Sequence, residues 1–400
     1  MANSLRTDTV EVPGGGAGGT AGISTPALRV LIWSDSDQFA GTERHCCELE
    51  LGLRKLGVAV EVGCPDRSPI GLVVRANGGV VFPLNSKGVS TVGAVWTVVG
   101  MLRDRRVDVI HSHNGNAAIL GALSVWMAGR GALVVTQHFI TPARMARRGV
   151  LKFLATVVHR WVASRVNGWI AVSGAVAVAM EARGDALKAA VQVIWNGLSG
   201  VQSDPVGVRD AQRSTLVKSG ALRLVCVARL GVEKGHRTLL YALALLKAEG
   251  LDFSVWLVGE GDLRPALERL CKALGLTSDV HFVGHQANPG DWVAASEVLV
   301  LASPEEPFGL VLLEAMSLGK PVVAARGGGP SEIVADGQSG LLFERDDPRD
   351  LALKLRALMD RESLREMMGK AGFARWKRLF SPERMSVETS EVYHRALVKG

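Results

Sequence analysis

Two glutamates, Glu306 and Glu314, lie eight residues apart around the start of a nearly uncharged helical pattern that begins at Phe308. Glu314 falls in or just past the second turn among apolar neighbours, where an unpaired charge is costly. Glu306 precedes the helix, beside free backbone N–H groups and the positive end of the helix dipole. The two carboxylates could accept hydrogen bonds from two hydroxyl-bearing parts of one ligand. The N–H groups of Phe308, Gly309 and Leu310 would suit a phosphate.

The same pair also fits a purely structural role. Glu306 could cap the helix and Glu314 could be a carboxylate satisfied inside the fold, and the spacing alone leaves both roles open. The surroundings are those of a ligand site, because an apolar strand at 298–301 precedes the pair and a second one at 322–325 runs into the glycines at 327–329. In open α/β sheets, ligands bind at the loops that follow the carboxyl ends of the strands.

Two cations lie five residues apart in another predicted strand-to-helix loop. Arg229 and Lys234 follow the apolar strand 224–228 and precede a helix expected over 237–249. Arginine can grip two oxygens and lysine acts as a point charge, so the pair could be aimed at one diphosphate. A solvated charged loop is the alternative interpretation.

The run Glu306-Pro-Phe-Gly-Leu-Val-Leu-Leu-Glu314-Ala-Met resembles the Glu-x7-Glu signature of glycosyltransferase family 4, which comprises retaining enzymes with the GT-B fold. The resemblance implies that Glu306 contacts hydroxyls of the donor sugar and that Glu314 contacts the ribose of the nucleotide. The pattern Arg229-Leu…Lys234-Gly is similar to the family's, which implies that both cations stabilise the departing diphosphate. Phe308, Gly309 and Leu310 belong to the donor site on this basis.

Further matches lie in the N-terminal half. The loop after the first strand keeps Gly41 with Glu43, where the family often has Gly-Gly-x-Glu, and this implies a loop that faces the acceptor and the donor diphosphate. Thr136-Gln-His138 is similar to the family's Thr-x-His. The resemblance implies that His138 contacts the transferred sugar near the reacting carbon, whereas a capping or core histidine is the alternative.

A rival nucleotide-binding motif fails in the C-terminal half. Gly259-Glu-Gly261 suggests a dinucleotide fingerprint, but Arg264 occupies the position of the third glycine. The resemblance instead implies that Gly259 and Gly261 shape the wall around the base. His285, after the strand 280–284, is expected at the edge of the base.

No metal site is predicted. His111 and His113 alternate on one predicted strand and could ligate zinc together, but no third ligand with recognisable spacing is near them. Asp35-Ser-Asp37 matches a short metal-binding pattern, and the helix that follows favours a loop with a capping aspartate. Neither a metal nor another cofactor is expected, since the nucleotide-sugar donor is a substrate.

The length of 400 residues predicts two domains. We expect a disordered Gly-rich tail over 1–26, an N-terminal acceptor-side domain over 27–198, and a nucleotide-sugar-binding domain over 199–382. A last helix over 383–397 should pack back on the first domain. The predicted fold class is therefore α/β, of the GT-B type, with two doubly wound Rossmann-like domains facing across a cleft.

The composition predicts a cytoplasmic protein. Five scattered cysteines lack metal-ligand spacing, the start lacks a signal-peptide pattern, and the longest apolar runs are shorter than the ~18 residues that a membrane span needs. The charge is uneven, because the first 199 residues hold 20 lysines and arginines against 13 acidic residues, whereas the remainder holds 26 of each. A basic amphipathic helix over 144–165 could lie on the anionic inner face of the cytoplasmic membrane, or it could be a helix packed on the sheet with a solvated basic face.

The predicted function is transfer of a sugar from a nucleotide-diphosphate sugar to a hydroxyl of a saccharide or lipid-linked acceptor, with retention, in cell-envelope polysaccharide, lipopolysaccharide or glycolipid synthesis. No nucleic-acid partner is expected. Two alternatives use the same donor pocket. A GT-B sugar-nucleotide epimerase would need carboxylates in the N-terminal wall, where 109–180 has none. A non-catalytic sugar-nucleotide-binding protein would lack the acceptor side.

Overall fold

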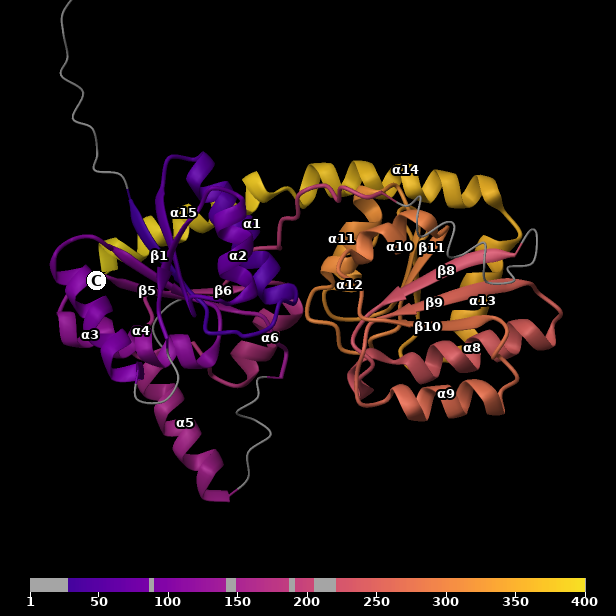
Figure 1. Ribbon diagram of the computed structural model, residues 1–400, viewed down its shortest axis with the longest axis horizontal. Coiled ribbons are helices and arrows are strands. Elements are labelled where there is room, and N and C mark those ends of the chain that lie inside the picture. The colour runs from indigo at the N-terminus through magenta and orange to yellow at the C-terminus, as the bar shows by residue number, and fades with distance from the viewer. Residues whose placement is uncertain (1–27, 86–89, 142–148, 187–190, 205–220, 400) are drawn as a thin grey trace, which may run out of the picture.

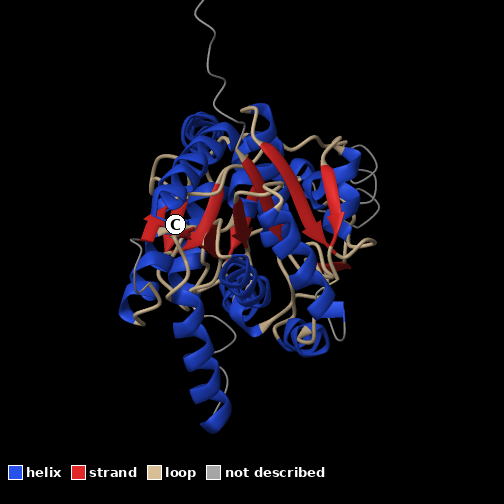
Figure 2. Ribbon diagram, turned by 90° about the vertical axis from the view of Figure 1, so that its left-hand side faces the viewer, coloured by secondary structure: helices blue, strands red, loops and turns tan. Residues whose placement is uncertain are grey.

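The computed structural model describes residues 28–85, 90–141, 149–186, 191–204 and 221–399 as two α/β domains side by side (Figure 1). The predicted tail over 1–26 and residues 205–220, between the two sheets, lie outside the described residues. Within each domain, parallel strands are covered by helices on both faces (Figure 2). The predicted class of two doubly wound domains is confirmed.

The N-terminal domain contains a seven-stranded parallel sheet in the order β3-β2-β1-β4-β5-β6-β7. Its strands read as continuous apolar runs, as expected when both faces of a sheet are covered. The strands are β1 (Arg29–Trp33), β2 (Ala59–Cys64), β3 (Val80–Pro83), β4 (Val109–Ser112), β5 (Ala132–Gln137), β6 (Gly168–Ala171) and β7 (Val191–Val193). The helices are α1 (Gly41–Lys55), α2 (Pro69–Ala76), α3 (Ser90–Arg103), α4 (Gly115–Ala128), α5 (Gly149–Ala163) and α6 (Gly174–Ala182).

The C-terminal domain contains a six-stranded parallel sheet in the order β10-β9-β8-β11-β12-β13. The strands are β8 (Leu222–Val227), β9 (Phe253–Val258), β10 (Val280–Gly284), β11 (Val298–Leu301), β12 (Val322–Ala325) and β13 (Leu341–Phe343). The helical elements are η2 (Val232–Lys234), α8 (His236–Ala248), α9 (Arg264–Ala273), α10 (Pro289–Ala295), α11 (Leu310–Ser317), α12 (Pro330–Ile333), α13 (Pro348–Met359) and α14 (Glu362–Leu379).

Each sheet reverses its strand order once, between β1 and β4 in the first domain and between β8 and β11 in the second. Such reversals open a crevice at the carboxyl ends of the two strands, where ligands of doubly wound folds bind. The loops after β1, β4, β8 and β11 are therefore the ones that the architecture offers to a ligand.

The last helix, α15 (Pro382–Lys399), belongs to the core of the N-terminal domain. It packs on α1, β5 and β6, and its buried side chains Met385, Val392 and Tyr393 join the apolar cluster under β1 and β2. The Tyr393 hydroxyl lies 2.6 Å from Nδ1 of His111 at the end of β4.

Helix α5 projects from the N-terminal domain in both views (Figures 1 and 2). Its apolar residues from Val150 to Leu154 are exposed, with 73% of Val150 and 68% of Phe153 open to solvent. The alternative of a helix packed on the sheet is therefore wrong for these turns. Arg144 and Arg148 of the predicted basic face lie outside the described residues. Among the described residues, no helix combines the length and apolar character needed to cross a bilayer.

Candidate active site

The loops after β8 and β11 bring a predicted cation and a predicted carboxylate together. Lys234 Nζ donates to Glu306 Oε2 at 2.8 Å, although 72 residues separate them in the chain. The side chain of Lys234 is 25% exposed and that of Glu306 is 13% exposed, so the pair is half-buried rather than solvated. β8 and β11 are neighbours in the sheet, and for this reason the two loops meet.

The other predicted cation is placed differently. The Arg229 guanidinium donates to Glu233 at 2.6 Å within its own loop, and 71% of its side chain is exposed. The solvated-loop interpretation thus describes Arg229 in this conformation, whereas Lys234 faces Glu306.

Glycines allow the loops around this pair to stack closely. A Cβ at Gly328 would lie 2.1 Å from the carbonyl oxygen of Glu306, and one at Gly329 would lie 2.2 Å from Cα of Phe308. Gly259 and Gly261, which were predicted to form the wall around the base, allow a similarly close approach in the loop after β9, the strand next to β8. A Cβ at Gly259 would meet the carbonyl oxygen preceding Arg229 at 2.1 Å, and one at Gly261 would meet that of Leu230 at 2.5 Å. These glycines hold the Arg229 and Glu306 loops in place.

Glu314 lies in the second turn of α11, 7% exposed, and its partner comes from the other domain. Arg44 Nη1, in the first turn of α1, donates to Glu314 Oε1 at 2.6 Å. Burial raises the pKa of Glu314, and the charge of Arg44 opposes that rise. Sequence reasoning missed Arg44, whose only signal is its place just after the Gly41 loop.

The N-terminal ends of α1 and α11 face each other across the domain interface. A Cβ at Gly41 would lie 3.5 Å from Cδ1 of Leu310, so the predicted glycine loop meets the predicted phosphate-binding turn. The N-cap residues of both helices make no side-chain cap hydrogen bond, and the positive dipole ends favour an anion between them, although at α1 the Glu43 carboxylate already accepts from the Ala40 N–H at 2.9 Å. Gly309, with φ of 102°, shapes this turn, and Phe308 is buried beneath it.

The wall contributed by the N-terminal domain is a group of buried histidines. His138, after β5, is 7% exposed, and its Nε2 lies 3.1 Å from Nδ1 of His113. The ring of His45, from α1, lies edge-on to His138 with 4.9 Å between centroids. No third ligand with recognisable spacing accompanies His111 and His113 along the sequence, but in space the fold brings His45 and His138 to His113.

Burial lowers the pKa of each histidine in this wall. The pKa of His45 falls to about 4, and those of His111, His113 and His138 lie well below their usual value. All four rings are therefore neutral near pH 7. His111 is held through both nitrogens, by Thr136 Oγ1 at 2.7 Å and by Tyr393.

Glu332 of α12 forms a second set of contacts between the domains. Its carboxylate accepts from the backbone N–H of Gly174 and Ala175 at 3.0 and 3.2 Å, and from Nε1 of Trp195 at 2.6 Å. Ser173 Oγ donates to the carbonyl oxygen of Pro307 at 2.6 Å. Glu332 and Ser173 therefore join the two domains through contacts between residues far apart in the chain.

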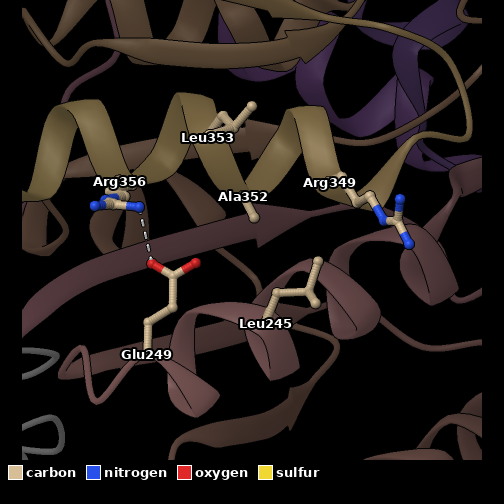
Figure 3. A pocket seen from close by; sticks show the side chains of 6 residues that line it. All are labelled: Leu245, Glu249, Arg349, Ala352, Leu353 and Arg356. Atoms are coloured by element: carbon tan, nitrogen blue, oxygen red, sulfur yellow. Dashed lines mark ion pairs between the residues drawn. The ribbon is translucent and has the colours of Figure 1, made fainter.

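His285 is exposed after β10, and the preceding Gly284 accepts from the backbone N–H of Gly259 at 2.8 Å, so His285 follows a residue that contacts the predicted base-wall loop. A hollow between α8 and α13 contains an Arg356–Glu249 ion pair of 3.2 Å (Figure 3). Its apolar lining residues are Leu245, Ala352 and Leu353, with Arg349 at one end. This hollow contains none of the predicted site residues.

Two family models match the chain. Residues 39–199 match the model described as Glycosyltransferase Family 4, and residues 208–375 match the model described as Glycosyl transferases group 1. The boundary between the matches falls in the segment between the two sheets.

Curated relatives carry related names. A D-inositol 3-phosphate glycosyltransferase from Nocardioides sp. is 30% identical over 310 residues, which is 72% of this chain and 67% of the relative. The lipopolysaccharide core biosynthesis glycosyltransferase LpsD of Rhizobium meliloti is 30% identical over 209 residues, 52% of this chain and 59% of the relative. For LpsE of the same organism, the identity is 34% and the match spans 43% of the relative. The chain thus spans between two fifths and two thirds of the length of these relatives.

A solved structure shares the architecture along most of the chain. Anabaena HepE, crystallised with UDP and glucose, superposes with a TM-score of 0.77 at 22% identity, covering 92% of this chain and 99% of HepE. At this identity the likeness shows the fold alone. The family models, the Nocardioides relative and the shared architecture together show that the chain belongs to glycosyltransferase family 4, the group 1 glycosyltransferases with the GT-B fold.

Proposed function

We propose that this protein transfers a sugar from a nucleotide-diphosphate sugar to an acceptor hydroxyl with retention of the anomeric configuration. The observation that carries the proposal is the Lys234–Glu306 pair, 2.8 Å long, beside the facing N-terminal ends of α1 and α11. A lysine and two helix ends supply positive potential for a diphosphate, and Glu306 supplies an acceptor for sugar hydroxyls.

The donor would lie along α11. Its ribose would hydrogen-bond to Glu314, its diphosphate would lie between the helix ends and Lys234, and its sugar would lie between Glu306 and His138. Glu314 is already paired with Arg44, so ribose hydroxyls have to replace that guanidinium or share the carboxylate with it. The UDP and glucose bound to HepE make uridine diphosphate sugars the first donors to test.

In the proposed step, the bond between the anomeric carbon and the diphosphate oxygen breaks while the acceptor oxygen approaches from the same face. The acceptor proton passes to the departing phosphate oxygen. Negative charge develops on the diphosphate, and groups already aimed at that charge lower the barrier. Lys234, Arg229 once released from Glu233, and the helix N–H groups would supply this stabilisation without a metal. His138 would contact the sugar as a neutral ring.

A matched pair of glutamate variants tests the donor site. Thermal melts of the wild type, Glu314→Gln and Glu249→Gln are recorded with UDP, GDP, ADP and their sugar derivatives. We expect one nucleotide to raise the Tm of the wild type and of Glu249→Gln, which alters a glutamate–arginine pair outside the site, and to leave Glu314→Gln unchanged. No stabilisation of the wild type, or equal stabilisation of all three, would refute the site. Product anomers from the active donor, assigned by NMR, test retention.

We further propose that the acceptor is presented at an anionic membrane surface on the cytoplasmic side, in envelope glycan or glycolipid synthesis. Exposed apolar side chains on the projecting α5 support this, since an interfacial helix buries such a face at the lipid boundary. The exposed side chains are those of Val150, Leu151, Phe153, Leu154, Val157 and Val158. The basic composition of the N-terminal half adds attraction to anionic lipid.

Liposome flotation tests the membrane proposal. We expect the wild type to float with vesicles that contain phosphatidylglycerol and to float less with neutral vesicles, and Phe153→Ser with Leu154→Ser to abolish flotation. Leu353→Ser, at a position that is 60% exposed in the other domain, is the matched control and should float like the wild type. Equal recovery of the α5 variant and the control would rule out this helix as the docking element.

A further inference from the structure

Three histidines from three different elements meet in the interior of the N-terminal domain. His45 comes from α1, His113 follows β4 and His138 follows β5, and all three are buried. One ring nitrogen of each lies within 4.8 Å of the other two, and the closest pair, Nδ1 of His113 and Nε2 of His138, is 3.1 Å apart. A cluster of this kind has the nitrogen donors of a metal site.

His113 Nδ1 and His138 Nε2 lie within hydrogen-bond distance of each other, but other ring nitrogens of the cluster have no such partner among the described residues. Neither nitrogen of His45 nor Nε2 of His113 has a hydrogen-bond partner among the described residues. The Asn196 side chain faces His45: burial lowers the pKa of His45 and the contact with Asn196 opposes that change, although the buried Asn196 oxygen makes no bond of hydrogen-bond geometry with the described residues. Buried polar atoms are satisfied in most proteins, and each exception calls for an unseen water, an ion or a functional role. His111 differs, because Thr136 and Tyr393 occupy both of its nitrogens.

The protonation state and the geometry both suit a transition metal. Burial keeps the three rings neutral, and the neutral imidazole is the form that ligates metals. With Zn–N bonds of about 2.0–2.1 Å, the nitrogens of a tetrahedral site lie about 3.3–3.4 Å apart. The His113–His138 nitrogen pair, at 3.1 Å, is already near that value, and all three donor nitrogens lie within 4.8 Å of one another.

We propose that His45, His113 and His138 bind one divalent transition-metal ion, with Zn²⁺ as the preferred occupant. Three imidazoles without a carboxylate select zinc, copper or nickel over magnesium and calcium, which prefer oxygen ligands. Three protein ligands leave a fourth position for water or for the Asn196 oxygen. The ion takes no part in the proposed transfer. If His138 also contacts the donor sugar, which depends on the proposed function, ion binding and sugar contact compete for the same ring.

Metal titration of the full chain, freed of metal by chelator, tests the site without any activity assay. Zn²⁺ is titrated by calorimetry, and Co²⁺ is titrated by visible absorption, which reports ligand number and symmetry. The variants are His45→Asn and His113→Asn. The control is His281→Asn, which alters a half-exposed histidine stacked on Trp256 in the other domain.

We expect one Zn²⁺ per chain in the wild type and the control, with intense four-coordinate Co²⁺ bands. Loss of a supporting partner of a ligand weakens a metal site about 10–100-fold, so loss of a ligand itself should weaken it by at least that much. Circular dichroism of the variants separates loss of a ligand from loss of the fold. Failure of the folded wild type to bind Zn²⁺, or equal affinity in a folded His45→Asn or His113→Asn variant, would overturn the proposal.

Discussion

Replacing Arg44 with methionine should expose the cost of keeping Glu314 buried. The variant retains much of the arginine's apolar volume but removes the guanidinium that lies 2.6 Å from the carboxylate. Glu314 is 9% exposed at its side chain and Arg44 is 31% exposed, so the carboxylate loses its partner without gaining water. A hydrogen bond to a charged group contributes about 1.5–3 kcal/mol, and the partial exposure of Arg44 points to about 2 kcal/mol.

The assay is a double-mutant cycle in unfolding free energy. Arg44→Met, Glu314→Gln and the double variant are unfolded in urea, and the coupling energy should be about 2 kcal/mol, since contacting residues couple by about 0.5–3 kcal/mol. In a thermal melt, about 2 kcal/mol corresponds to roughly 4–8 °C for a domain of this size. A coupling energy below about 0.5 kcal/mol would show that the pair holds neither domain and would refute the reasoning.

The stability that Arg44→Met loses relative to the wild type should change with pH in one direction only. Burial already raises the pKa of Glu314, and removal of the opposing Arg44 charge raises it further. A carboxyl with a folded pKa above its unfolded value binds protons more strongly in the folded state, so its stability contribution is present at low pH and is lost as the pH rises through that range. The deficit of Arg44→Met relative to the wild type should therefore be smaller at pH 5 than at pH 7.5. A deficit that grows on acidification would contradict this account.

Three further predictions concern the transfer step and the packing. Lys234→Ala should lower kcat by about 10²–10³-fold in a transfer assay, the usual loss for one group that stabilises developing charge, with a smaller change in KM. Gly329→Ala should abolish nucleotide-induced stabilisation in thermal melts because its Cβ would meet backbone at 2.2 Å, whereas Gly100→Ala, with open space in α3, should be stabilised by up to about 1 kcal/mol. Tyr393→Phe should lose about 1–3 kcal/mol in urea unfolding because it leaves a buried nitrogen of His111 unpaired, and an unchanged midpoint would refute that bond.

Much of the fold could be predicted from the sequence, because the patterns that indicate strands, helices and turns are local. Apolar strands alternating with helices, and turns such as the one at Gly309, can be read within a few residues, and they predicted both doubly wound domains. The Lys234 and Glu306 loops were predicted as ligand loops because each follows an apolar strand. Their direct contact needed the neighbouring placement of β8 and β11, which strand patterns alone do not determine.

The missed residues depend on contacts between distant parts of the chain. Arg44 and Glu314 are 270 residues apart, and Glu332 reaches Gly174 across 158 residues. No periodicity connects such positions. His45 was missed as a partner of His113 for the same reason, since a search for metal ligands along the sequence considers spacing, whereas the fold places α1 beside the ends of β4 and β5.

The position of α15 has a consequence for synthesis. Its residues Met385, Val392 and Tyr393 complete a core whose other walls are formed by β1, β2 and α1. The first domain to leave the ribosome therefore lacks part of its interior until α15 has been made, whereas the sheet of the second domain is complete with β13, which precedes α15. Domains usually fold in order from the N-terminus. Here the domain that starts first should reach its native core last, and in the interval it exposes apolar surface that a chaperone can bind.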